Sequence, residues 1–304
     1  MLNYQKIANK PHLLRNFTGF TQETFTKLVP SFSRAYENHL ETHDRSRAIP
    51  RQRQRGGGRK PILQTPEDRL LFILFYFKFY PTQEVLAFFF GFSQGQANHW
   101  IHRLTVVVNQ ALGYEMQLPF RQPADISVIL AQCPSLEFII DGTERPIQRP
   151  KDSDRQRKCY SGKKKRHTVK NIVITEKQTG KIKGLSPTDE GKKHDKAITD
   201  EQNYRFPQGT KLYQDTGFQG YAPPNTTIYQ PKKKPRGREL TSEDKQRNRE
   251  LSKERIGVEH SIGGVKIYHI VRDVYRNHKM GYDDLVMETT CGLHNFSIHH
   301  RKAA

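Results

Sequence analysis

One segment of the chain has a composition that no folded core can contain. Residues 45–61, RSRAIPRQRQRGGGRKP, have seven basic residues, no acidic ones and three consecutive glycines. Burying that many unpaired cations costs too much free energy, so the segment must lie in solvent or against a polyanion. Two interpretations stay open. It can be a flexible linker, or a basic arm whose Arg55, Arg59 and Lys60 lie along a DNA minor groove.

The whole chain is strongly cationic. Its 304 residues include 51 Lys+Arg against 31 Asp+Glu, a net charge of +20. Such a cation repels itself unless a polyanion is nearby, which favours nucleic acid as the partner and an anionic membrane surface less strongly. The charge is also concentrated, with +7 in residues 45–60, +9 in residues 145–170 and +5 in residues 229–255. We therefore expect two or more separate contacts with the polyanion.

Several classes of protein are excluded by length and composition. A chain of 304 residues is more compatible with two domains than with one. No apolar run reaches the roughly 18 residues of a membrane span, and the N-terminal MLNYQKIANK lacks the apolar segment of a secretory signal. Three widely spaced cysteines argue against a disulfide framework. We expect a soluble, cytoplasmic protein that does not bind membranes.

Residues 65–110 have the spacing of three helices joined by tight turns. Thr65 is suited to cap a helix that Pro81 stops, the segment TQEVLAFFF forms a second helix that ends at Gly91, and Ser93 caps a third. This is typical of a helix-turn-helix, whose last helix enters the DNA major groove. Other three-helix bundles share the periodicity, and the neighbouring basic segment is what favours DNA binding. The residues expected to face DNA are Gln94, Gln96, Asn98, His99 and Arg103, while Ala97, Trp100, Ile101 and Leu104 pack inward.

The remaining segments indicate one further helix and a sheet. Residues 1–43 are interpreted as one helix preceded by a loop. From residue 136 the pattern becomes strand-like, and the predicted order is three strands, a helix at 194–202, two strands and a long helix over 240–262. The strands are 136–141, the antiparallel pair within 167–186, 210–221 and 225–233. This order predicts a mixed sheet with a helix on each side.

Two of the predicted strands end in an acid, Asp141 and Asp215. If the strands are neighbours, both carboxylates lie at one edge of the sheet, and Glu259 on the long helix completes a triangle. Three converging carboxylates repel one another unless a hard cation such as Mg²⁺ is bound. Two such ions can activate a water or a 3′-hydroxyl and stabilise the leaving oxygen of a phosphodiester. Asp195 is a competing acid, but its place at a helix start is explained at least as well by N-capping.

Four segments in order carry a resemblance to a known family: FIIDGTERPIQRP, YSGKKKRHTVKN, LYQDTGFQGY and ERIGVEHSIGGVK. They resemble the DDE-type transposases of bacterial insertion sequences, in the group related to Harbinger elements, and residues 65–110 resemble the helix-turn-helix that precedes that catalytic domain. The resemblance implies an α/β, RNase H-like catalytic domain. It also places Asp141, Asp215 and Glu259 where the family's catalytic, metal-binding triad stands, with spacings of 74 and 44 in residue number between successive members.

The domains expected on this basis are an N-terminal helical segment (1–44), the basic arm or linker (45–64), the helix-turn-helix (65–115) and the catalytic domain (134–302). Basic residues beside the proposed catalytic strands are expected to hold DNA phosphates, although each run can also be a solubilising loop. These residues are Lys163, Lys164, Lys165, Arg166, Lys232, Lys233, Lys234 and Arg255. Arg255 lies one helical turn before Glu259 and can pair with it or hold a phosphate.

The primary hypothesis is a transposase that binds the terminal inverted repeats of its element. It would cleave DNA with two Mg²⁺ ions, or Mn²⁺, and join the freed 3′-hydroxyl to target DNA. The resemblance implies a homodimer or higher multimer on double-stranded DNA. Two alternatives stay open: a transposition-deficient DNA-binding regulator and a stand-alone RNase H-like nuclease.

Overall fold

The computed structural model describes residues 1–46, 60–235, 237 and 239–301. The chain divides into two compact units. Unit 1 contains Met1–Leu118, Ile267–Asp273 and Leu285–Ala304, and unit 2 contains Pro119–Lys266 and Val274–Asp284. Among the described helices, none is both long enough and apolar enough to cross a membrane. The domain boundaries expected from the sequence stay predictions.

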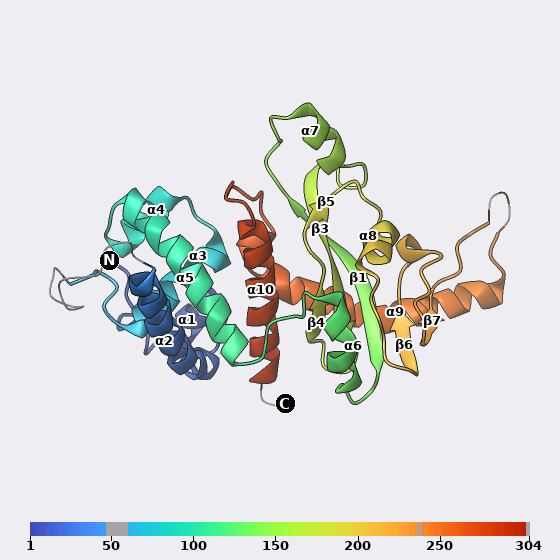
Figure 1. Cartoon of the computed structure of the whole chain (residues 1–304), viewed down its shortest axis with the longest axis horizontal. Coiled ribbons are helices and arrows are strands. Elements are labelled where there is room, and N and C mark those ends of the chain that lie inside the picture. Colours follow the sequence, from blue (N-terminus) through green and yellow to red (C-terminus); the bar gives the residue numbers. More distant parts are fainter. Residues whose placement is uncertain (47–59, 236, 238, 302–304) are drawn as a thin grey trace. The chain divides into compact units, whose positions relative to one another are not determined.

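Unit 1 is helical. Its elements are α1 (Pro11–Thr18), α2 (Gln22–Arg45), α3 (Pro66–Phe79), α4 (Gln83–Phe90), α5 (Gln94–Tyr114), the 3-10 turn η2 (His269–Val271) and most of α10 (Tyr282–His299) (Figure 1). The prediction of a single helix before residue 43 is wrong, because Gly19 adopts a left-handed φ of 81° that ends α1. The side chain of Thr21 then caps α2.

The helix-turn-helix elements form where the sequence predicts them. Thr65, Thr82 and Ser93 each cap a helix by accepting a hydrogen bond from the backbone N–H three residues later. Ser93 and Gln96 form a full capping box. Gly91 ends α4 at a φ of 75°, a left-handed conformation that glycine adopts without strain. Local chemistry therefore accounts for each boundary of this part of unit 1.

Unit 2 is built on a mixed seven-stranded sheet. Its central order is β2-β3-β1-β6-β7, and β4 and β5 also pair with β3. The strands are β1 (Glu137–Pro146), β2 (Tyr160–Ser161), β3 (Arg166–Glu176), β4 (Ile182–Leu185), β5 (Asp189–Glu190), β6 (Thr210–Tyr213) and β7 (Thr226–Tyr229). The helices are α6 (Pro123–Ala131), α7 (Ser153–Cys159), α8 (Asp195–Gln202), the 3-10 turn η1 (Thr216–Phe218) and α9 (Ser242–Lys266) (Figure 1). This mixed sheet with helices is consistent with the RNase H-like class predicted.

The alternation of side chains along β1 separates the two faces of the sheet. Phe138 and Ile140 belong to the main core cluster, together with Leu130 of α6 and Ile198 of α8. Ile139 lies between them in the sequence, so its side chain points to the other face of the sheet. Its Cδ1 lies 3.8 Å from the point that a Cβ added to Gly257 of α9 would occupy. Thus α6 and α8 cover one face and α9 covers the other, as the element order predicts.

Unit 2 differs from the sequence-based expectations in several details. The strand expected over 210–221 ends at Tyr213, and α6, α7, β2 and β5 are not among the predicted elements. β1 does not end at Asp141, because Gly142–Pro146 continue the antiparallel ladder opposite Ile172–Thr168 of β3. α9 also continues through the paired glycines at 263–264 to Lys266. The difference in β1 matters for function, since it makes β1 a long strand with Asp141 in its middle.

Candidate active site

Asp141 lies within β1, and Asp215 lies two residues past the end of the neighbouring parallel strand β6. β1 and β6 pair in the register Ile139 opposite Tyr213, and each aspartate follows two residues later. The Asp141 carboxylate accepts a hydrogen bond of 2.8 Å from the Gly142 N–H. That of Asp215 accepts one of 2.7 Å from the Gly217 N–H and caps η1. The strand pairing therefore brings the two acids together where β6 ends beside the middle of β1, and not at a common strand end as expected; their catalytic role stays a prediction.

Asp141 is held in an environment that disfavours its charge. Its pKa is raised from 3.8 to about 6, chiefly by burial and also by the nearby carboxylates of Asp215 and Asp195. The guanidinium of Arg255 opposes this effect, as does the Gly142 N–H. A nearby cation would favour the ionised form of Asp141, because its charge would offset the repulsion among the three carboxylates.

Asp195 has a different role from the one predicted. The helix α8 has His194 as its N-cap residue, without a side-chain cap, so the capping interpretation of Asp195 is wrong. Its carboxylate instead forms an ion pair of 2.9 Å with Lys170 on β3. A Cβ at Gly142 would lie 2.7 Å from Asp195 Oδ1, and one at Gly217 would lie 3.2 Å from Oδ2. The two glycines that follow the aspartates are therefore what makes room for this third carboxylate.

Glu259 lies on α9, on the same face as Arg255 and Lys266, which both interact electrostatically with Asp141. Arg255 is four residues before it and lowers the pKa of Asp141. Lys266 is seven residues after it; burial lowers the pKa of Lys266, whereas the charges of Asp141 and Glu144 raise it. These spacings put all three within about 40° on the helix. The Glu259 side chain is exposed, and the described residues contain no cluster of three or more His, Cys, Asp or Glu that could hold a metal ion.

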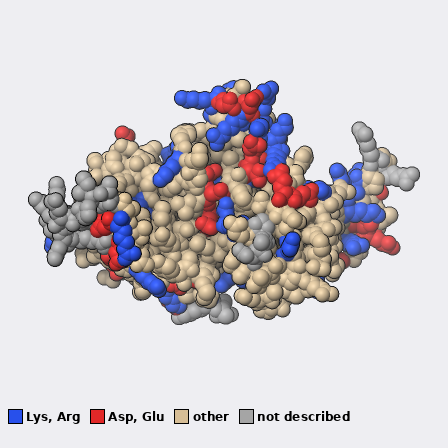
Figure 2. Space-filling view, in the orientation of Figure 1, with Lys and Arg blue, Asp and Glu red and all other residues tan. Residues whose placement is uncertain are grey.

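The basic residues predicted to hold DNA differ in whether they form ion pairs within the chain. Lys163, Lys164, Lys165 and Arg166, in and after the turn between β2 and β3, are exposed and have no ion-pair partner among the described residues. Lys164 also acts electrostatically on Lys266. By contrast, Lys232 pairs with Asp244 at 2.7 Å and Lys234 pairs with Glu239, while Lys233 is exposed. Figure 2 shows Lys and Arg gathered over α7, mixed with a few acids.

On the helix-turn-helix, Gln94, Gln96 and His99 are exposed and Asn98 and Arg103 are partly exposed. Ala97, Ile101 and Leu104 are buried as predicted, whereas Trp100 is only partly buried and stacks on Tyr36 with 6.5 Å between ring centroids. Two of the predicted contacts have partners within the chain. Gln94 donates to Gln83, and Gln96 accepts the Ser93 N–H in the capping box. Lys60 is exposed, and Arg55 and Arg59 lie outside the described residues.

Comparisons with known proteins agree with this arrangement. The sequence model of the family described as DDE superfamily endonuclease matches residues 140–295, and that of the helix-turn-helix of DDE superfamily endonuclease matches residues 62–113. A probable transposase for insertion sequence element IS702 from Microchaete diplosiphon is 30% identical over 243 residues, which cover 79% of this chain and 83% of the relative. No solved structure matches the chain. Because a family model matches about half of the chain, including both aspartates, and a second covers the segment of α3 to α5, the chain belongs to the DDE superfamily endonucleases with an N-terminal helix-turn-helix.

Proposed function

We propose that the protein is the transposase of an insertion sequence, which binds the terminal inverted repeats of its element and carries out metal-dependent DNA cleavage and strand transfer. The observation that carries this proposal is that Asp141 of β1 interacts electrostatically with Asp215, which follows the adjacent parallel strand β6, and with Arg255 of α9. The likeness to a probable insertion-sequence transposase supports the choice of reaction.

Asp141, Asp215 and Glu259 are proposed to hold divalent metal, Mg²⁺ or Mn²⁺, with two ions as the expected number. The donor set fits, because carboxylate oxygens are the ligands that Mg²⁺ prefers and Asp141 is disfavoured as a lone charge. When bound, these ions supply a nucleophilic oxygen at neutral pH and stabilise the leaving oxygen. The side chain of Glu259 would turn from solvent toward the aspartates, on the helix face that already carries Arg255 and Lys266.

The chain's cations are proposed to position the DNA backbone. Arg255 and Lys266 interact electrostatically with Asp141, and the exposed Lys164 acts in turn on Lys266. Phosphate contacts of this kind fix the register of the duplex without reading its sequence. The exposed or partly exposed side chains of α5, with the basic arm, would read the element ends. Two ends must be held together for strand transfer, so a dimer or higher multimer on DNA is part of the proposal.

The proposal is tested with labelled oligonucleotides that carry the inverted repeats flanking the gene. Asp141→Asn and Glu259→Ala should leave end binding within about twofold and abolish Mg²⁺-dependent cleavage. Glu250→Ala is the matched control, since Glu250 is an exposed acid of the same helix. Cleavage retained in Glu259→Ala would remove that residue from the site.

The products separate the alternative functions. Joining of a labelled 3′ end to target DNA indicates a transposase, and cleavage without joining indicates a stand-alone nuclease. Binding of the repeats without cleavage by the wild-type protein indicates a regulator.

A further inference from the structure

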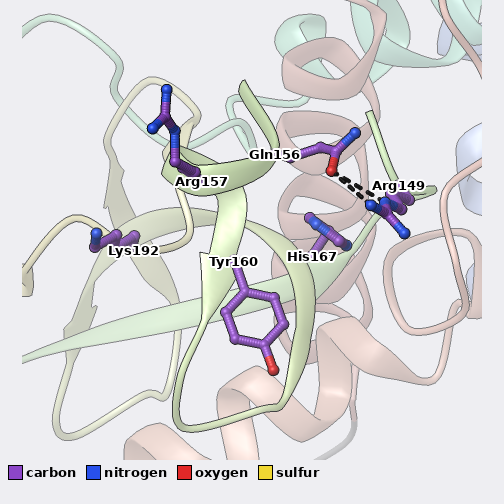
Figure 3. A pocket seen from close by; sticks show the side chains of 6 residues that line it. All are labelled: Arg149, Gln156, Arg157, Tyr160, His167 and Lys192. Atoms are coloured by element: carbon purple, nitrogen blue, oxygen red, sulfur yellow. Dashed lines mark hydrogen bonds between the residues drawn. The ribbon is translucent and has the colours of Figure 1, made fainter. Parts of the chain in front are cut away.

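A pocket in unit 2 lies away from the proposed metal site and has a different chemistry. It is lined by Arg149, Gln156, Arg157, Tyr160, His167 and Lys192 and has a volume of about 510 Å³ (Figure 3). That volume is within the roughly 300–1,000 Å³ of small-ligand sites. Three of the six lining residues are cationic, two are aromatic and none is acidic. We propose that this pocket binds an unstacked nucleotide of the substrate DNA, an inference that rests on the proposed function.

The frame of the pocket is held by backbone hydrogen bonds. Tyr160 pairs with His167 across the β2–β3 ladder. The His167 carbonyl accepts a bond of 3.0 Å from Ile147 N–H, and Lys192 N–H donates one of 3.1 Å to the Lys158 carbonyl. The segments that carry the six side chains are therefore tied to one another, so the pocket is a feature of the sheet end and not of a single loop.

The positive charge of the pocket is available to a phosphate. The Nε and Nη2 atoms of Arg149 both donate to the amide oxygen of Gln156, at 3.1 and 2.9 Å. Because that acceptor is neutral, the bonds orient the guanidinium and leave its charge uncompensated. Arg157 is paired with Asp154, whereas Lys192 is exposed at the opposite side of the pocket in Figure 3. These cations make the pocket positive, which favours an anionic ligand.

The two aromatic rings that line the pocket, those of Tyr160 and His167, favour a nucleotide over a phosphate alone. Tyr160 is 43% exposed on β2, the strand at one end of the sheet order. It meets His167 edge to face, with 5.6 Å between centroids and 70° between planes, so the two rings do not stack on each other. A ring with a free face beside cations is how proteins bind single-stranded nucleic acid, since every base can stack on it.

The pocket lies some distance along β3 from Asp141, so the nucleotide that it binds is not the one at the cleaved bond. Asp141 is opposite Val173 in the β1–β3 ladder, and His167 lies six residues from Val173 along β3. At about 3.3 Å per residue this separation is roughly 20 Å. The pocket is therefore too far from Asp141 for one nucleotide to reach both, so the bound nucleotide is expected several positions from the cleaved bond.

The test compares two DNA probes on the full-length protein at fixed salt. One is a duplex that ends in a single-stranded tail of about six nucleotides, and the other is the same duplex fully paired. Tyr160→Ala should weaken binding of the tailed probe by about 5- to 100-fold and change binding of the paired probe by less than twofold. Tyr160→Phe keeps the ring and should bind like wild type. Val128→Ala, which truncates an exposed apolar side chain of α6 in the same unit, is the control.

A second measurement locates the base. Probes with 5-iodouracil at successive tail positions should crosslink to the peptide containing Tyr160, with a maximum at one position of the tail. An unchanged ratio of the two affinities in Tyr160→Ala, or crosslinks confined to other peptides, would overturn the pocket assignment. These outcomes are independent of the proposed function, whose failure would appear as cleavage retained in Asp141→Asn or as no DNA binding by the wild-type protein.

Discussion

The Asp141 carboxylate should make unit 2 less stable at neutral pH when no metal ion is bound. Its pKa is raised from 3.8 to about 6 in the fold, so the folded protein keeps a proton there that the unfolded chain loses. The stability associated with the neutral carboxyl is present below about pH 4 and is lost as the pH rises through about 6. Each unit of pKa is worth about 1.4 kcal/mol, so the destabilisation at pH 8 is about 3 kcal/mol.

Asp141→Asn removes this charge while its amide oxygen can still accept the Gly142 N–H. With a chelator at pH 8, we expect the variant to raise the free energy of local unfolding of β1 and β3 by about 1–3 kcal/mol. At pH 4 the difference should vanish. Hydrogen exchange read by mass spectrometry for peptides of β1 and β3 is the assay, because it reports unit 2 separately.

Saturating Mg²⁺ gives the complementary result. It should stabilise the wild-type strands and leave the variant nearly unchanged, because the cation compensates a charge that only the wild type has. A variant that is equally or less stable than wild type at pH 8 without metal would refute the reasoning about Asp141.

Individual contacts carry the remaining predictions. Gly142→Ala brings a Cβ to 2.7 Å from Asp195 Oδ1, so cleavage and Mg²⁺ affinity should both fall. Gly263→Ala, whose Cβ would meet nothing within 4 Å, should leave cleavage unchanged and stabilise α9 by about 1 kcal/mol in thermal unfolding. Lys164→Ala should reduce the salt dependence of DNA binding by about one phosphate contact in titrations at several ionic strengths. On α5, Asn98→Ala should lose about 1–3 kcal/mol of discrimination between specific and mutated ends, whereas Gln96→Ala should mainly lower the melting temperature through its lost cap.

The parts of the fold that could be predicted are those that depend on neighbouring residues. Thr65, Thr82 and Ser93 precede helices because their side chains bind backbone N–H groups three residues ahead, and that pattern is visible within a few letters of sequence. The length of β1 could not be predicted in the same way. Gly142 and the residues after it are extended because β3, about thirty residues later, offers them a ladder.

The candidate site shows the same division. Asp141 and Asp215 could be chosen from strand patterns and a family likeness, and the β1–β6 register supports the choice. Asp195 of α8 could not be chosen in this way, because its position depends on Lys170 of β3 and on Gly142 and Gly217, which are distant in the sequence. The local signal was weak, since a glycine one or two residues after an aspartate is also common at ordinary turns.

The stacking of Trp100 on Tyr36 has a practical consequence for work on this protein. Trp100 is the one tryptophan of the chain, and it lies in unit 1 beside His99 on the helix proposed to enter the major groove. Intrinsic tryptophan emission therefore reports on that helix and is blind to the sheet. The change in this emission after mixing with DNA would give the rate at which the helix binds an element end. A separate cleavage assay would then show how much later the DNA is cut, without any label on the protein.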